Sequence, residues 1–147
     1  MLHTGRVWFL VADGRRARLL NEERRGRALV ESWSMEIGAE DTYDPQDRPP
    51  RSFDRVGAGR HAMDKGRSLH EQEEVNFLNR VAQRITDAEK HGEFDHLVIA
   101  APPRALGLLR EKLAAAVRTR VRAETPKDLL DEPVPRLRER LSELLRG

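Results

Sequence analysis

A Gly-rich, basic stretch at residues 51–67 holds the residue types and spacing best suited to binding chemistry. Its sequence is RSFDRVGAGRHAMDKGR, with five cationic side chains against two carboxylates. Glycine lets a ligand approach the backbone closely, and arginine offers phosphate a two-pronged donor. The candidate binding residues in this stretch are Arg51, Arg55, Gly57, Gly59, Arg60 and His61. A flexible, solvated loop explains the same composition, and the pattern leaves both interpretations open.

Arg104 is a further binding candidate because it follows Pro102 and Pro103 at the start of a predicted helix. That helix comes directly after an apolar strand. Open α/β sheets bind ligands at the carboxyl ends of such strands, and helix N-termini favour anions. The favoured alternative is structural: Arg104 pairs with a neighbouring acid, for example Glu124 or Asp128.

Asp13 ends the first predicted strand, where metal-dependent nucleases of the ribonuclease H type hold a carboxylate. Such an enzyme needs about two to four carboxylates converging on one or two metal ions. Asp95 and Asp128 lie at the wrong ends of their elements for that. A two-residue hairpin turn, with positive φ at Asp13 and Gly14, is the favoured interpretation.

The other residues that commonly do chemistry form no recognisable site. There is no cysteine, and the five histidines are scattered. His61 and His70 lie nine residues apart, which matches no common zinc pattern. His61 could act as a general base, but no nucleophile or orienting acid is assigned around it. We therefore predict no metal and no cofactor, name no catalytic residue, and favour a non-enzymatic protein.

The composition favours one soluble domain over residues 1–147. Charged residues make up 35% of the chain, yet the formal net charge is only +2, so any basic patch must be local. The absence of cysteine is compatible with a reducing cytosol. The first apolar run, residues 7–12, is too short for a signal-peptide core or a membrane span. We expect a cytoplasmic protein without membrane insertion.

Hydrophobic periodicity predicts the elements that position these candidates. Strands are expected at residues 6–12, 16–21, 28–35, 97–101 and 121–124. Prolines and the lack of an apolar period predict a long irregular loop over residues 36–67. A capping box from Ser68 to Glu71 then starts a helix that ends near Lys90, before Gly92. Further helices are expected from residues 102–103 to about 117, from Thr125-Pro126, and over residues 134–146.

The long helix has an apolar stripe that includes Leu78, Val81 and Ile85, which we expect to face a sheet. The order of elements is β-β-β-α-β-α-β-α. Three antiparallel strands followed by helical crossovers predict an α/β fold with a mixed five-stranded sheet and helices on both faces. The apolar strand at residues 97–101 should lie inside the sheet, parallel to its neighbours. This is a ribonuclease-H-like arrangement.

Short strings along nearly the whole chain carry a family resemblance. They are VADG and RAR (residues 11–14 and 16–18), RSFD (51–54), GAGRHAM (57–63), FD (94–95), APPR and LGLLR (101–104 and 106–110), and Glu124 with KDL (127–129). In this order they resemble the bacterial host attachment protein family. That resemblance implies a distant relation to the middle domain of archaeal and eukaryotic peptide-chain release factors. Those factors carry a Gly-Gly-Gln loop where this chain has Gly59-Arg60-His61, without glutamine in the stretch.

Three functions are compatible with these features. The favoured one is a translation-related factor that binds RNA or a ribonucleoprotein such as the ribosome through residues 51–67. These residues would be mobile until an anionic partner orders them. The second is a hydrolase acting on a phosphate ester, with Arg60, His61 and Arg104 in the site. The third is a protein-interaction module that affects cell-surface adhesion indirectly.

Overall fold

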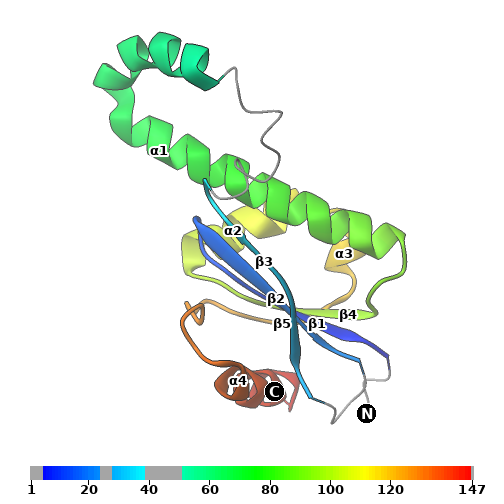
Figure 1. Ribbon diagram of the computed structural model, residues 1–147. Helices are drawn as coiled ribbons and strands as arrows, with labels where there is room; N and C mark the ends of the chain where they lie inside the picture. Colours follow the sequence, from blue (N-terminus) through cyan, green and yellow to red (C-terminus); the bar gives the residue numbers. More distant parts are fainter. Residues whose placement is uncertain (1–4, 24–27, 39–50, 147) are drawn as a thin grey trace.

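The computed structural model of the chain describes residues 5–23, 28–38 and 51–146, with the backbone alone for residues 51–68 (Figure 1). The strands are β1 (Val7–Ala12), β2 (Arg16–Glu22), β3 (Val30–Glu36), β4 (His96–Ala100) and β5 (Val121–Thr125). The helices are α1 (Arg51–Lys90), α2 (Pro103–Lys112), α3 (Ala115–Arg118) and α4 (Val134–Arg146). Among the described residues, no helix is both long and apolar enough to cross a membrane.

The five strands form one mixed sheet in the order β3-β2-β1-β4-β5. β1 and β2, and β2 and β3, are antiparallel, whereas β1, β4 and β5 are parallel. The predicted fold class is therefore confirmed, and β4 lies inside the sheet as expected. β4 is buried along nearly its whole length because helices cover both faces at this position.

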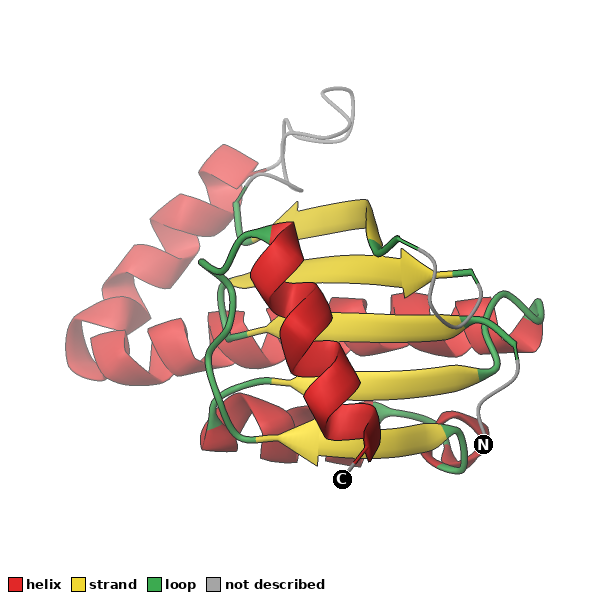
Figure 2. Ribbon diagram, turned by 90° about the horizontal axis from the view of Figure 1, so that it is seen from below, coloured by secondary structure: helices red, strands yellow, loops and turns green. Residues whose placement is uncertain are grey.

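Helices α1, α2 and α3 cover one face of the sheet and α4 crosses the other (Figure 2). Strand β1 is buried throughout, and its side chains alternate between the two cores. Trp8, Leu10 and Ala12 belong to the core under α1, and Val7, Phe9 and Val11 to the core under α4. The prediction for α1 is confirmed, because Leu78, Val81 and Ile85 are at most 1% exposed in the first of these cores.

Helix α1 begins at Arg51, so the predictions of an irregular loop over residues 51–67 and of a capped start at Ser68 are wrong. Arginine, alanine, methionine and lysine favour helix, and each glycine costs only about 1 kcal/mol. Residues added to an already nucleated helix need no new nucleus, and proline suits the positions just before a helix start. In Figure 1 the ribbon of α1 bends in its N-terminal part. Residues 39–50 lie outside the described part of the chain.

The predicted helix over residues 102–117 is in fact two helices, α2 and α3, separated at Leu113. Leu113 has an extended conformation, and its carbonyl oxygen accepts a hydrogen bond from Nη1 of Arg118 at 2.7 Å. Because this guanidinium bonds the carbonyl freed by the break, the helix can turn and bury both Leu113 and Val117.

Thr125 and Pro126 do not begin a helix, which corrects another prediction. Thr125 is the last residue of β5, and its carbonyl oxygen accepts the N–H of Ala101 at 3.1 Å. The residue before a proline is restricted toward extended conformations, so Thr125 suits a strand end better than a helix cap. The next helix is α4, whose bounds match the prediction.

Candidate functional site

The parallel strands β1, β4 and β5 all end at one side of the sheet, which we call the carboxyl edge. It comprises residues 13–15 after β1, 101–104 after β4 and 126–128 after β5. The chain leaves β1 toward β2 on one side and leaves β4 toward β5 on the other. Open α/β sheets bind ligands where neighbouring strands part in this way, so the topology singles out this edge.

Helix α1 extends past the carboxyl edge. Its Glu74 lies over Gly14: a Cβ atom on Gly14 would stand 2.8 Å from Oε1 of Glu74. The helix runs from there across the sheet to Lys90, shortly before β4 begins. Residues of α1 that precede Glu74 therefore extend beyond the edge (Figure 1). The basic stretch at residues 51–67 and the loops that follow the parallel strands thus lie at the same end of the molecule.

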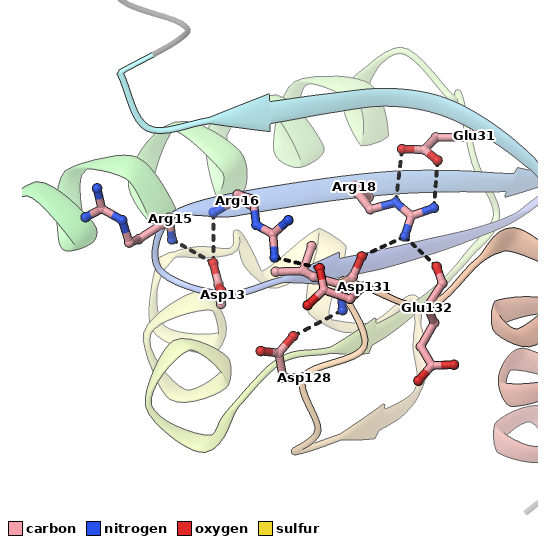
Figure 3. Close-up of polar contacts among 9 residues, drawn as sticks. Asp13, Arg15, Arg16, Arg18, Glu31, Asp128, Asp131 and Glu132 are labelled. Carbon is pink, nitrogen blue, oxygen red and sulfur yellow. Dashed lines mark hydrogen bonds and ion pairs between the residues drawn. The ribbon is translucent and has the colours of Figure 1, made fainter.

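Asp13 holds the turn between β1 and β2 through its side chain (Figure 3). Its Oδ1 accepts the backbone N–H groups of Arg15 and Arg16, both at 2.8 Å. The structural interpretation of Asp13 is confirmed, but the predicted turn type is wrong. The glycines with positive φ in the described residues are Gly5, Gly38 and Gly92, and Gly14 is not among them. The carboxylate of Asp13 caps the turn, and the glycine at position 14 leaves room for Glu74.

Arg18 ties the loop after β5 to the sheet (Figure 3). Its Nε and Nη2 donate to the carboxylate of Glu31 at 3.1 and 2.8 Å, and its Nη1 donates to the carbonyl oxygens of Leu130 and Glu132, both at 2.8 Å. The side chain is only 17% exposed. Sequence reasoning missed this residue. The available signal was the alternation of Arg16 and Arg18 along β2, which places both on one face.

Arg16 makes a more exposed contact beside Arg18. Its Nη2 lies 3.1 Å from Oδ1 of Asp131, and this hydrogen bond raises the pKa of the Arg16 guanidinium. Both side chains are open to solvent, so the contact contributes little to stability. Arg16 and Arg18 together hold residues 130–132 beside the carboxyl edge, and Arg18 makes the larger number of hydrogen bonds to them.

The carboxylates at this edge act in turns and do not converge on a metal. Asp128 accepts the N–H of Leu130 at 3.1 Å, much as Asp13 caps its own turn. Asp95 lies at the opposite edge, where Oδ2 accepts the N–H of Arg6 at 2.8 Å. Within the described ranges, no group of three or more histidine, cysteine, aspartate or glutamate side chains is placed to hold a metal ion.

The prediction that Arg104 pairs with a neighbouring acid, Glu124 or Asp128, is wrong. Glu124 instead accepts two hydrogen bonds from Arg110, at 2.8 and 2.6 Å, which raise the pKa of that guanidinium. Asp128 is occupied by the N–H of Leu130. Arg104 is exposed in the first turn of α2, which has neither a side-chain cap nor an acidic residue. No hydrogen bond or ion pair joins its side chain to any described residue.

Two more cations at the carboxyl edge resemble Arg104 in their exposure and in their lack of polar side-chain contacts to other described residues. Arg15 and Lys127 are exposed, and within the described part of the chain their side chains make no hydrogen bond or ion pair. Arg15 follows β1, Arg104 follows β4 and Lys127 follows β5, so one such cation stands at the end of each parallel strand. Sequence reasoning found Arg104 and missed Arg15 and Lys127, because only the topology brings the three loops together.

The remaining predicted binding residues lie on the N-terminal part of α1 and not on a loop. They are Arg51, Arg55, Gly57, Gly59, Arg60 and His61. The structure describes only their backbone, so their part in a site stays a prediction. The expectation that this segment is mobile until an anionic partner orders it is also a prediction. What the fold adds is their position, on the overhanging end of α1 beyond the carboxyl edge (Figure 1).

Comparisons with known proteins agree with this architecture. A family model described as "Protein required for attachment to host cells" matches residues 8–141. No curated protein matches the chain. Among solved structures, the chain is similar to an archaeal translation termination factor, aRF1, with a TM-score of 0.50 and 11% sequence identity. That likeness covers 97% of this chain and 41% of the termination factor, and at this identity it concerns the fold alone.

Proposed function

The chain belongs to the family of proteins required for attachment to host cells, and we propose that it is a non-enzymatic cytoplasmic protein that binds RNA, free or in a ribonucleoprotein. The observation that carries this proposal is the set of three exposed cations at the carboxyl edge, Arg15, Arg104 and Lys127. None of them has a partner among the described residues, whereas neighbouring arginines such as Arg18 and Arg110 do.

A polyanion fits this arrangement better than a small ligand does. Arg15 and Lys127 come from two loops and Arg104 from the first turn of α2, and residues 51–67 add five more cations beyond the edge. A phosphodiester backbone can contact such a spread of charges one phosphate at a time and release counterions as it binds. The uncapped start of α2 offers backbone N–H groups and a favourable dipole to one phosphate.

The choice of RNA among polyanions is supported by the similar fold of the archaeal translation termination factor, a protein whose own role lies in translation. The protein would then work in the cytoplasm, for which its lack of cysteine is suitable. Any effect on attachment to host cells would be indirect, through the RNA or ribonucleoprotein that it binds.

A salt titration tests the RNA-binding proposal. The test variant replaces Arg15, Arg104 and Lys127 by alanine. The matched control replaces three cations away from this edge that also lack described partners: Lys90, Lys112 and Arg122. We expect the slope of log affinity for single-stranded RNA against log salt to fall by about 2 in the test variant, since each lost phosphate contact removes about 0.7. Equal losses in both variants would show that binding follows net charge and not this edge.

Peptidyl-tRNA hydrolysis separates a binding protein from an enzyme with the same fold. We expect none, because residues 51–67 contain no glutamine, and the family resemblance implies that release factors carry theirs in the corresponding stretch. The measurement is release of a labelled peptide from ribosomes loaded with peptidyl-tRNA. Hydrolysis that disappears in the Gly57→Ala or Gly59→Ala variant would show that another group replaces the glutamine, and the protein would then be an enzyme.

A further inference from the structure

Strand β3 is one of the two edge strands of the sheet in the described structure, and β5 is the other. Strand β3 has seven residues and pairs with β2 on one side only. Its side chains are exposed or half-buried along the whole strand, and Val30 is 58% exposed. A strand of this length at an edge is a template for another extended chain, because its outer backbone groups are free to pair.

The hydrogen-bond pattern shows which backbone groups of β3 point outward. The N–H of Ile37 donates to the carbonyl oxygen of Arg15 at 2.8 Å. In an antiparallel ladder, hydrogen-bonded and non-hydrogen-bonded positions alternate, so Met35 and Trp33 also bond toward β2. The N–H and C=O groups of Ser34 and Glu36 must therefore point to the open side. None of the described residues bonds to them there.

A hollow of about 820 Å³ runs along this edge. It is lined by Arg16, Ala17 and Arg18 of β2, by Glu31 and the four residues from Trp33 to Glu36 of β3, by Arg84 of α1 and by Leu130 of the loop after β5. Consecutive residues of a strand point to opposite faces, so an occupant on one face would touch only alternate ones. With Arg84 of α1 on one side and Leu130 on the α4 side, the hollow reaches both faces of the sheet.

The two faces of this hollow differ in chemistry. On the α1 side, Trp33 and Met35 are half-buried against the core, and the guanidinium of Arg84 lies 4.3 Å from the centre of the Trp33 ring. On the other side, Glu36 is exposed and makes no ion pair among the described residues, while Glu31 is held by Arg18. An incoming strand would meet an apolar surface on one face and, on the other, the carboxylate of Glu36 next to Arg16, its cross-strand neighbour on β2.

We propose that the open edge of β3 binds an extended protein segment as a sixth strand of the sheet. The segment alternates apolar residues, which pack on Trp33 and Met35, with lysine or arginine, which lies beside Glu36. The backbone of the segment bonds to Ser34 and Glu36, which fixes its register. Cross-strand pairs of opposite charge and apolar pairs both stabilise such an addition. This surface is separate from the cations of the carboxyl edge, so the proposal does not depend on RNA binding.

The probe is an octapeptide of alternating lysine and valine with blocked ends, and a peptide of alternating glutamate and valine is the control. In the protein alone, we expect the amide protons of Ser34 and Glu36 to exchange rapidly with solvent. The lysine peptide should slow both at least tenfold and bind at least ten times more tightly than the glutamate peptide. The Glu36→Lys variant should reverse this preference. Amide exchange and a titration followed by NMR measure these effects.

Two substitutions at Ser34 separate backbone pairing from general attraction. Ser34→Pro removes an N–H that points away from β2, so an edge strand should tolerate it. It should weaken binding of the lysine peptide at least tenfold and leave RNA binding and the melting temperature unchanged. Ser34→Thr keeps the N–H and should bind the peptide as the original protein does.

Each other outcome overturns the proposal. If Ser34→Pro binds the lysine peptide normally, or if the peptide does not bind at all, the edge is not a docking surface. If the amides of Ser34 and Glu36 are already protected in the protein alone, or Ser34→Pro lowers the melting temperature, the edge is already occupied. Sedimentation would then distinguish a second copy of the chain from a segment of the same chain.

Discussion

The N-terminal and C-terminal parts of α1 are both helical, but they differ in composition and in whether they pack against the sheet. Residues 69–90 place a stripe of apolar side chains against the sheet, whereas residues 51–67 have three glycines, five cations and no such stripe. The comparison shows that an apolar stripe decides which part of a helix packs, and that it does not decide where the helix begins.

A similar contrast separates two groups of cations. Arg18 and Arg120 are held in place, the first by Glu31 and two carbonyl oxygens, the second by Glu89 at 3.1 Å. Arg15, Arg104 and Lys127 have no such contacts among the described residues. The first group joins elements of the fold, and the second is available to a partner. The following predictions test whether stability and binding are divided in this way.

The largest effect on stability should come from the packed part of α1. Leu78→Ala removes a side chain that is 1% exposed and should lower the free energy of unfolding by about 2–5 kcal/mol. Asn79→Ala, at the next and exposed position, should change it by less than about 0.5 kcal/mol. Urea denaturation of both variants gives the comparison. A similar small change for Leu78→Ala would mean that this side chain does not carry the packing.

An intermediate effect is expected for Arg18→Lys. A lysine keeps the charge but cannot bond both oxygens of Glu31 and also reach the carbonyl oxygens of Leu130 and Glu132. Loss of these bonds should lower the free energy of unfolding by about 1–3 kcal/mol. The control is Arg16→Lys, whose exposed contact with Asp131 should matter little. Equal effects in urea denaturation would show that Arg18 does not tie down the loop.

The contacts of Arg18 also show why the sequence predicts some features and not others. Periodicity is local, so it correctly predicted the interior strand β4, the α1 stripe and the bounds of α4. The contacts of Arg18 join residues 112 and 114 positions apart, and no local pattern contains them. The candidate site can be derived from the sequence only in part for the same reason. Arg104 is marked by its helix start, whereas Arg15 and Lys127 are brought to the same edge only by the sheet topology.

The wrong predictions have local causes as well. The Asp13-Gly14 pair suggested a turn with positive φ, but the side chain of Asp13 caps a turn that does not need it. The glycines of residues 51–67 suggested a loop, although helix continuation from the packed part of α1 outweighs their cost. In both cases glycine allows several conformations, and the contacts around it select one.

A smaller effect on stability is expected at Gly14, and its sign should depend on the residue at position 74. Gly14→Ala alone should slightly lower the melting temperature, because the new Cβ would stand 2.8 Å from Oε1 and 2.9 Å from Cδ of Glu74. In a Glu74→Ala background the obstacle is gone, and the same change should raise the free energy of unfolding by about 0.4–1 kcal/mol by restricting the unfolded chain. The four melting curves form a double-mutant cycle. Additive effects of the two substitutions on stability would show that the Glu74 side chain does not need the space left by Gly14.

The smallest effect on stability, and a large one on binding, should follow from changing Arg60 and His61 together to alanine. Both positions lie in the part of α1 without an apolar stripe, and alanine is the better helix former at each. The melting temperature should therefore stay constant or rise slightly. Affinity for single-stranded RNA should fall, and its salt dependence should flatten, because charge-assisted contacts to phosphate are lost.

The rival hypothesis for residues 51–67 predicts the opposite result for this double variant. If Phe53 and Met63 pack the segment onto the rest of the protein, the change should disturb that packing and lower the melting temperature without altering RNA affinity. Measuring both quantities on one preparation decides between the two. A loss of stability with unaltered binding would end the functional assignment of this segment and leave the three cations at the carboxyl edge as the only tested site. A loss of binding at constant stability would show that the overhanging part of α1 contributes to binding and not to the fold.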